Sequence, residues 1–249
     1  MKGGALFPAR LEYTKRGKVR FLGHRDVARN LERAFRITAL PLSFSEGFNP
    51  HPKFSFGLAL TVGYESDAEY LDVEFAEQID LGALPEALTA ALPDGISVTG
   101  AVWLDDRAPA LQEAVVSVVW MAEVCRIDDE RVDEVLLAEA IAKALASESI
   151  EFTKTRKGRS QIEDIRPLIK RLEIVHSTES NDLTNPCSGP LVMMELASKG
   201  AKPSEVLAAI GPYTSWRGIR THQYIERDGL QCTPLQVDTR QRVAEAIAS

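Results

Sequence analysis

Four arginines recur along one stretch of this chain at the spacing of a helix, and together they could bind consecutive phosphates. The four are Arg25, Arg29, Arg33 and Arg36. With about 100° between successive residues, they fall within about 80° of one another on a helical wheel. They lie opposite the apolar positions Val27, Leu31 and Phe35. Four cations this close repel one another unless an anion shares them, and a nucleic-acid backbone would do so. The alternative is an ordinary solvated helix face.

Basic residues on both sides of this helix favour the nucleic-acid interpretation. Four of them precede it: Lys15, Arg16, Lys18 and Arg20. His51 and Lys53 follow it, in the loop Glu46–Lys53, whose two prolines leave it little conformational freedom. A rigid loop that exposes Phe48 and Asn49 would suit recognition of a base or a phosphate. The alternative for Phe48 is a buried anchor of the loop.

A second basic patch lies in the C-terminal half of the chain. It consists of Lys154, Arg156, Lys157 and Arg159, followed by Arg166. We interpret these residues as a second contact with nucleic acid. The alternative is a flexible charged hairpin.

His24 is the residue whose type could support catalysis. It lies between Gly23 and Arg25 at the expected start of the helix, where the positive helix end favours the neutral, basic form of an imidazole. A neutral histidine beside arginines could act as a general base on a ribose hydroxyl. On the helical wheel, however, His24 points toward the apolar side, which favours a capping or packing role.

Charge is distributed unevenly along the chain. The formal net charge is −7, yet residues 1–56 carry 11 Lys and Arg against 4 Asp and Glu, a net of +7. Residues 57–150 carry 4 against 20, and residues 151–249 carry 14 against 12. This asymmetry indicates an anionic partner for the basic part and a basic protein partner for the acidic part. The acids expected to contact that protein are Glu65, Asp67 and Glu69. The alternative is a solubilising surface without a partner.

Several classes of protein need motifs that this chain lacks. The sequence contains no Gly-x-Gly-x-x-Gly, Walker loop, His-Glu-x-x-His or Cys-x-x-Cys. Cys125, Cys187 and Cys232 are too scattered for a zinc site, an iron–sulfur cluster or a disulfide framework. We therefore expect no metal and no cofactor. No apolar run is long enough to cross a membrane, so we expect cytoplasmic localisation and no membrane partner.

The order of the expected elements repeats once along the chain. In the first set, strands are expected at Leu11–Thr14, Val19–Leu22, Leu42–Ser45, Tyr70–Phe75 and Ile96–Leu104, and helices at 25–39 and 84–92. In the second set, strands are expected at Ala114–Ile127, Ile150–Thr155, Arg171–His176, Leu191–Leu196 and Thr221–Arg227, and helices at Glu130–Leu145 and Pro203–Ile210. The apolar side of the Glu130–Leu145 helix is expected to hold Val132, Val135, Leu136 and Ile141.

This order predicts an α+β protein of two tandem ferredoxin-like domains, each βαββαβ. The N-terminal domain, with the basic helix and the Gly/Pro/His loop, is expected to cover residues 1–106. The C-terminal domain is expected at 107–236, followed by a tail at 237–249.

Several motifs resemble those of the bacterial radical-SAM-linked protein family. They lie at Arg10–Asp26, Leu31–Ala34, Leu42–Lys53, Ser55–Gly57, Glu65–Glu74 and Asp164–Pro167. Members of that family are encoded beside, or fused to, a radical S-adenosylmethionine protein with a cobalamin-type domain. This chain has no such domain and so resembles the stand-alone form. The resemblance implies a radical S-adenosylmethionine protein as a partner.

These observations predict a non-catalytic RNA-binding accessory that presents tRNA or rRNA to a radical S-adenosylmethionine protein for modification. One alternative is a metal-independent endoribonuclease that uses His24. The fold and this histidine resemble the CRISPR repeat-processing endoribonucleases, but the glycine-rich loop of those enzymes corresponds here to Gly211–Gly218, with only two glycines. A third possibility is a protein–protein adaptor in which residues 57–150 contact the partner and no RNA is bound.

Overall fold

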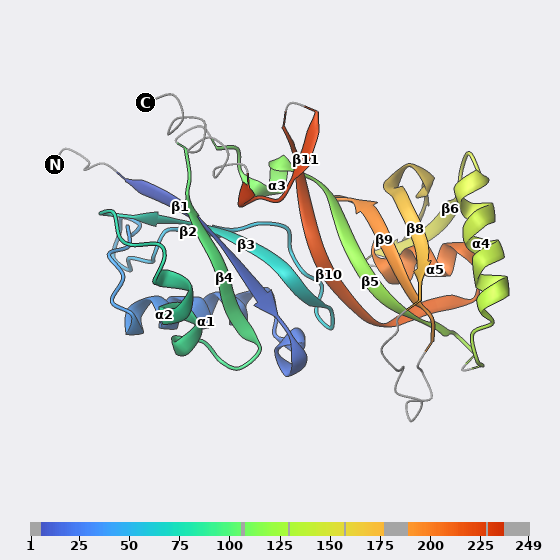
Figure 1. The fold of residues 1–249 in the computed structure, drawn as a ribbon, viewed down its shortest axis with the longest axis horizontal. Helices are drawn as coiled ribbons and strands as arrows, with labels where there is room; N and C mark the ends of the chain where they lie inside the picture. The colour runs from blue at the N-terminus through green and yellow to red at the C-terminus, as the bar shows by residue number, and fades with distance from the viewer. Residues whose placement is uncertain are drawn as a thin grey trace. The chain divides into compact units, whose positions relative to one another are not determined.

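The chain folds as a mixed α+β protein in two units (Figure 1). The computed structural model describes residues 6–105, 108–128, 130–156, 158–176, 189–227 and 229–236. The first unit combines residues 1–115 with 223–249, and the second comprises residues 116–222. Strand β10 (Tyr213–Arg227) therefore belongs to the second unit up to His222 and to the first from Gln223 onward.

The first unit is a sheet with helices on one face. In chain order it contains β1 (Phe7–Lys15), the 3-10 helix η1 (Gly17–Phe21), α1 (His24–Ile37), β2 (Phe54–Phe56), β3 (Glu65–Phe75), α2 (Leu84–Ala91), β4 (Ile96–Trp103), α3 (Leu111–Ala114) and β11 (Leu230–Cys232). The strand order is β4-β1-β3-β10, with β2 also on β3 and β11 on β10. β1 is antiparallel to both β3 and β4, so that Leu11 faces Leu71 and Ala101.

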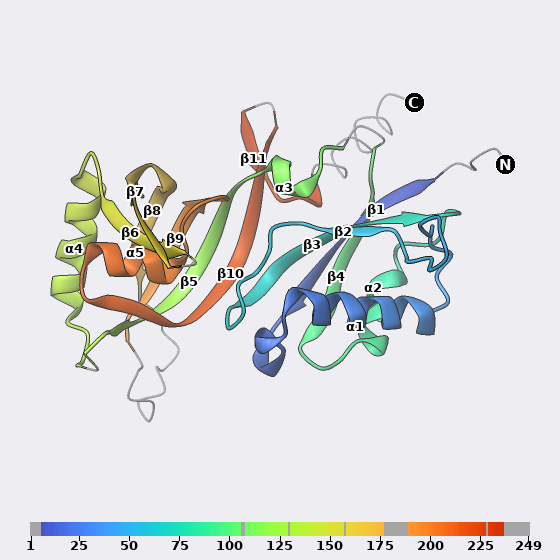
Figure 2. The same cartoon turned by 180° about the vertical axis from the view of Figure 1, so that it is seen from behind.

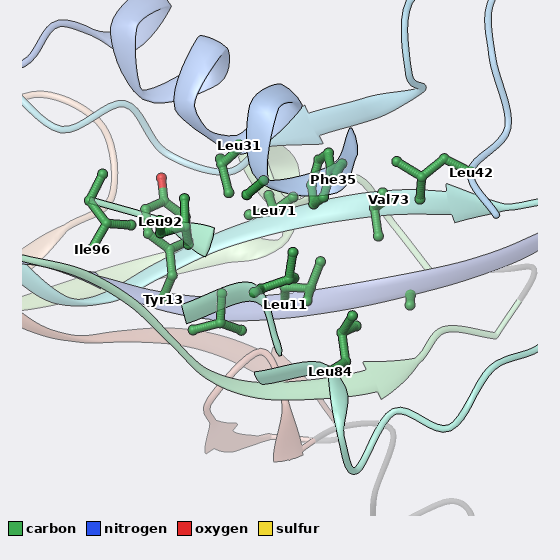
Figure 3. Close-up of a cluster of buried hydrophobic side chains, with 14 of the residues drawn as sticks. Leu11, Tyr13, Leu31, Phe35, Leu42, Leu71, Val73, Leu84, Leu92 and Ile96 are labelled. Atoms are coloured by element: carbon green, nitrogen blue, oxygen red, sulfur yellow. The ribbon is translucent and has the colours of Figure 1, made fainter. Parts of the chain in front are cut away.

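The core of this unit fixes which side of α1 meets solvent. Alternate residues of β1 point to one face of the sheet, and there Leu11 and Tyr13 are buried together with Leu31 and Phe35 of α1 (Figure 3). Leu84 of α2 joins the same cluster, which places both helices over the same face (Figure 2). The opposite side of α1 is consequently left to solvent.

In the part of the chain that the structure describes, the second unit contains further strands of the same nine-stranded sheet, together with its own helices. It contains most of β5 (Val115–Arg126), then α4 (Glu134–Ala146), β6 (Glu151–Arg156), β7 (Arg159–Asp164), the 3-10 helix η2 (Arg166–Leu168), β8 (Ile169–Val175), β9 (Leu191–Ala197), α5 (Pro203–Ile210) and the first part of β10. The strand order is β10-β5-β9-β8, while β6 and β7 form a separate antiparallel hairpin. Among the described residues, no helix is long and apolar enough to cross a membrane. The expected tail at 237–249 lies outside the described residues.

Two of the expected strands are wrong. Residues 17–21 form η1 instead of an extended segment, because Gly17 turns the chain at a φ of 65° and the Arg16 N–H bonds to the Gly95 carbonyl at 2.7 Å. Leu42–Ser45 makes only isolated bridges, one of them between Phe44 and Pro52. Proline has no N–H to donate, so this pairing cannot extend into a ladder. The second strand of the unit is β2 instead.

The apolar side of α4 was predicted correctly at Ile141 but wrongly at Val135 and Leu136. Val132 lies before the start of the helix. Val135 and Leu136 are exposed, whereas Leu137, Ile141 and Ala144 are buried. Apolar residues surround much of this helix, so periodicity alone leaves two possible inward faces. Packing against the rest of the unit selects one of them.

Candidate nucleic-acid interface

Helix α1 carries the four arginines on its solvent side. At its start, the Gly23 N–H donates to the Asp26 carboxylate at 3.3 Å, and at its end the Thr38 hydroxyl donates to the Ala34 carbonyl at 2.8 Å. Val27, Leu31, Ala34 and Phe35 are buried. Arg25, Arg29, Arg33 and Arg36 are all exposed. The predicted separation of a basic from an apolar face is therefore confirmed.

Little negative charge offsets this basic face. Arg29 lies 3.6 Å from Asp26, one turn earlier in the helix, and an exposed pair of this kind is weak. Arg36 donates to the Glu32 backbone carbonyl at 3.3 Å. Within the described part of the chain, Arg25, Arg33 and Arg36 form no ion pair. Their charge is thus available to an anion in solution.

The basic turn, which comprises Lys15, Arg16, Lys18 and Arg20 and includes most of η1, is built over a buried carboxylate. Glu65 is 0% exposed and accepts a hydrogen bond from the Gly17 N–H at 2.8 Å. The guanidinium groups of Arg16 and Arg20 each lie 3.7 Å from it, and Arg16 also binds the Asp67 carboxylate. These contacts fix the turn and partly neutralise both arginines.

The two lysines of this turn differ in role. Lys15 is 3% exposed, and its ammonium group donates to the carbonyls of Arg20 at 3.2 Å and Leu22 at 2.7 Å. Lys15 therefore ties the end of η1 to β1, and its charge is not at the surface. Lys18 is exposed. Of the predicted lysine contacts in this turn, only Lys18 presents its charge at the surface.

The loop after α1 projects as a closed hairpin. The Ser45 N–H donates to the His51 carbonyl at 2.9 Å, and the Lys53 N–H donates to the Ser43 carbonyl at 2.8 Å. Phe48, Asn49 and His51 are exposed beyond these bonds. Lys53 is exposed too, 3.4 Å from Glu74. The loop thus exposes Phe48 instead of burying it.

His24 is the first residue of α1 and is exposed. Its ring meets the edge of Phe56, with 4.3 Å between ring centroids. On its inner side it lines a cavity of about 20 Å³ together with Lys15, Glu69 and Tyr70, a volume that suits a single water molecule. His24 therefore packs against Phe56, as the helical wheel indicates, and is still exposed to solvent.

The second basic patch lies in the second unit and divides in two. Lys154 is 8% exposed; its ammonium group donates to the Gly200 carbonyl and lies 3.4 Å from Glu205. Arg166 donates to three backbone carbonyls, those of Leu145, Ser147 and Ile169, at 2.9–3.1 Å. Lys154 and Arg166 therefore stabilise the folded unit through these contacts. Arg159 is exposed on the β6–β7 hairpin. The Arg156 side chain and Lys157 lie outside the described residues.

The three acids expected to contact a protein do not form a surface patch. Glu65 and Glu69 are buried, and Asp67 is paired with Arg16. Among the described residues, no group of three or more His, Cys, Asp or Glu side chains is arranged to hold a metal ion. The acidic composition of residues 57–150 therefore does not produce the predicted docking site at these positions.

One exposed aromatic escaped the sequence prediction. Phe21 is 62% exposed at the end of η1, and the Arg20 guanidinium lies 4.8 Å from its ring centroid. The sequence analysis missed it because it predicted a strand over Val19–Leu22, in which Phe21 is simply one residue of an extended segment. The signal that was present is its position three residues before the start of α1, next to Arg20.

In structural terms, this is an α+β protein whose first unit carries a basic helix face. Comparison with protein families adds the family to which the chain belongs. Residues 9–203 match a family described as "Uncharacterized protein conserved in bacteria (DUF2344)". This chain belongs to that family. No curated protein matches the chain.

Solved structures show only distant similarity. A chain of a Cbf5-Nop10-Gar1 complex is 11% identical with a TM-score of 0.46, covering 86% of this chain and 48% of that one. A chain of an archaeal box H/ACA Nop10-Cbf5 complex is 10% identical with a TM-score of 0.43, covering 85% and 46%. A putative chlorite dismutase is 15% identical with a TM-score of 0.22, covering 77% and 78%. This chain spans about half the length of the first two, and none of these likenesses assigns a function.

Proposed function

We propose that this protein binds RNA, either tRNA or rRNA, through the arginine face of α1. The observation that carries the proposal is the set of exposed arginines on α1, three of which form no ion pair within the described part of the chain. Phosphate contacts by such side chains supply most of the sequence-independent affinity for nucleic acid. In the sequence, the exposed Lys18 precedes this helix and the projecting loop follows it.

We further propose that this protein is an accessory without catalytic activity of its own. In this proposal it presents its RNA to a radical S-adenosylmethionine protein, and the support is the motif resemblance at Arg10–Asp26 and Leu42–Lys53. Co-purification of the untagged protein from its native cell, with sequencing of bound RNA, tests the partner and the RNA together. Recovery of a radical S-adenosylmethionine protein that survives ribonuclease treatment, with no RNA, would favour the adaptor alternative instead.

The two units are proposed to be tandem ferredoxin-like domains. The supporting observation is that β4-β1-β3-β2 in the first unit and β10-β5-β9-β8 in the second follow the same pattern along the chain. Each would then be a βαββαβ unit, the second with the β6–β7 hairpin inserted. The domain boundaries 1–106 and 107–236 stay predictions.

Charge reversal on α1 tests RNA binding. In the Arg29→Glu/Arg33→Glu variant, affinity for tRNA at moderate salt should fall strongly. The slope of log affinity against log salt should become shallower, because about one counterion is released for each phosphate contact. Fluorescence anisotropy over a series of salt concentrations measures both quantities.

A matched control separates the α1 face from net charge. Arg131 and Lys143 are exposed in the second unit, so Arg131→Glu/Lys143→Glu changes the net charge by the same amount. This control should bind nearly as well as the wild type. Unchanged affinity in the α1 variant, or equal weakening in both folded variants, would contradict the proposal.

A second candidate is the metal-independent endoribonuclease, which the position of His24 favours. His24 is exposed and also lines a small cavity together with Lys15 and Glu69. Under our leading proposal, purified protein with a chelator leaves structured RNA intact. Cleavage to a 2′,3′-cyclic phosphate that is lost in His24→Ala would establish the nuclease. Removing a general base typically lowers a rate by about 10²–10⁴-fold, so the two outcomes are easily separated on a gel.

A further inference from the structure

Phe48 is the most exposed large apolar side chain among the described residues. Its relative exposure is 112%, so that solvent surrounds the ring on all sides. Phe21 differs, because the Arg20 guanidinium covers its ring at 4.8 Å. Within the described part of the chain, Phe48 makes no aromatic or cation contact. Both faces of its ring are therefore open to a planar ligand.

The loop that carries Phe48 is held in shape by its own hydrogen bonds. Ser45 and His51 are joined twice, by the Ser45 N–H to the His51 carbonyl at 2.9 Å and by the His51 N–H to the Ser45 hydroxyl at 3.1 Å. Pro50 and Pro52 restrict the returning chain. Gly47 adopts a φ of 125°, a conformation that side-chain-bearing residues rarely adopt. The cost of ordering this loop is thus met on folding, which favours tight binding at its tip.

The neighbours of Phe48 fit a nucleotide better than a protein. Asn49 and His51 at the tip can donate hydrogen bonds, and Lys53 adds a cation. Protein hot spots lie inside well-packed patches whose surrounding contacts exclude water, whereas this ring stands alone among polar residues. Bases that are unpaired offer a π-face to stack on such a ring, and stacking of this kind is a general mode of single-stranded RNA binding.

We infer that Phe48 is a stacking platform for an unpaired nucleobase, so that the RNA recognised by this protein is single-stranded where it meets the loop. This inference rests on the proposed RNA binding and specifies its substrate class. The arginines of α1 would hold the phosphate backbone, while Phe48 would discriminate unpaired from paired nucleotides. Duplex RNA keeps its bases stacked inside the helix and offers none to the ring.

The test compares Phe48→Ala with the wild-type protein on two RNA probes. One probe is an unstructured oligoribonucleotide of about 12 nucleotides, a length within the range of common single-strand sites. The other is the same strand paired with its complement. Phe48→Ala should bind the single strand about 5- to 150-fold more weakly, equivalent to about 1–3 kcal/mol for one stacked base. Duplex affinity and the salt dependence of binding should stay unchanged.

Two further variants make the outcome specific. Phe48→Trp should keep single-strand affinity, and the fluorescence of the added tryptophan should be quenched by the RNA. Ile127→Ala removes an exposed apolar side chain of the second unit and should have no effect. If Phe48→Ala binds the single strand like the wild type while Arg29→Glu/Arg33→Glu does not bind, stacking is overturned and RNA binding stands. If neither variant changes affinity, both proposals fail. Equal losses on single strand and duplex would also overturn the stacking role.

Discussion

Glu65 shows how a single buried carboxylate can organise a basic surface. It lies under η1, where it accepts the Gly17 N–H and is 3.7 Å from both Arg16 and Arg20. Burying a carboxylate is costly unless cations and hydrogen bonds compensate. Here one hydrogen bond and two guanidinium groups do so. We therefore assign Glu65 to the construction of the basic turn, not to contact with a protein.

Replacement of Glu65 should lower stability measurably. Glu65→Gln keeps the shape of the side chain but removes its charge beneath two arginines. We expect the free energy of unfolding to fall by about 1–3 kcal/mol, the range for hydrogen bonds to charged groups. The two arginines are partly exposed and can recover hydration, so a larger loss is not expected. Urea denaturation measures this difference.

Asp67→Asn is the matched control, because Asp67 binds the same Arg16 from a partly exposed position. Exposed ion pairs contribute about 0–1 kcal/mol, so this variant should lose little. Equal losses in the two variants would show that burial of Glu65 is not what makes it important.

At the scale of elements, the β6–β7 hairpin buries one basic side chain and exposes another. Lys154 is held between Glu163 and Glu205, at 3.7 Å and 3.4 Å, whereas Arg159 is exposed near the end of the hairpin. Strand alternation does not separate them, because Arg159 pairs with Arg156, two residues after Lys154, and so lies on the same face of the hairpin as Lys154. Their positions along the hairpin differ instead: Lys154 lies beside Glu205 of α5, whereas Arg159 begins β7 at the turn. In the second basic patch, Lys154 therefore stabilises the second unit, whereas Arg159 is available at the surface.

The buried and the exposed basic side chain of this hairpin should respond differently to mutation. Lys154→Met removes the cation shared by Glu163 and Glu205 and should lower the free energy of unfolding by about 1–3 kcal/mol, with no loss of RNA affinity in the folded protein. Arg159→Glu should leave stability within about 0.5 kcal/mol of the wild type. It should weaken RNA binding and reduce the salt slope by about 1 if this hairpin touches the backbone. Thermal melts and anisotropy titrations on both variants measure these effects. Weaker RNA binding in folded Lys154→Met would contradict the assignment of Lys154 to a structural role.

At the scale of the whole molecule, stability should depend on alkaline pH through Tyr70. Burial, followed by the nearby Glu12 carboxylate, raises the pKa of Tyr70 well above its ordinary value of 10.0. The Tyr70 hydroxyl donates to Glu12 in the folded state. In the unfolded chain the phenol would lose its proton above pH 10, while the folded protein retains it. The free energy of unfolding should therefore fall as pH rises above 10.

Tyr70→Phe removes this titration and gives the comparison. Its free energy of unfolding should decline less steeply than that of the wild type above pH 10, although it starts lower because Glu12 loses a hydrogen bond. Urea denaturation on both sides of that pH measures the two slopes. Parallel declines in the two proteins would show that Tyr70 is not the group responsible.

Short-range patterns in the sequence determined much of this protein. The helix at Pro203–Ile210 was predicted with its exact bounds, because proline at the start and glycine after the end are local signals. The basic face of α1 was predicted for the same kind of reason, since helical periodicity fixes which residues share a side. Membership of the family also follows from the sequence, over residues 9–203.

Only the tertiary structure decided which charged and aromatic side chains face solvent. Lys15 and Glu65 are far apart in the sequence, yet the antiparallel pairing of β1 with β3 brings their strand ends together, with Lys15 opposite Ser66. Lys15 is thereby buried, and Glu65 is buried beneath η1. Phe48 is held outward by bonds across its loop. Burial is a property of the packed surface, so residues of one type separate into structural and binding roles only when long-range pairings form.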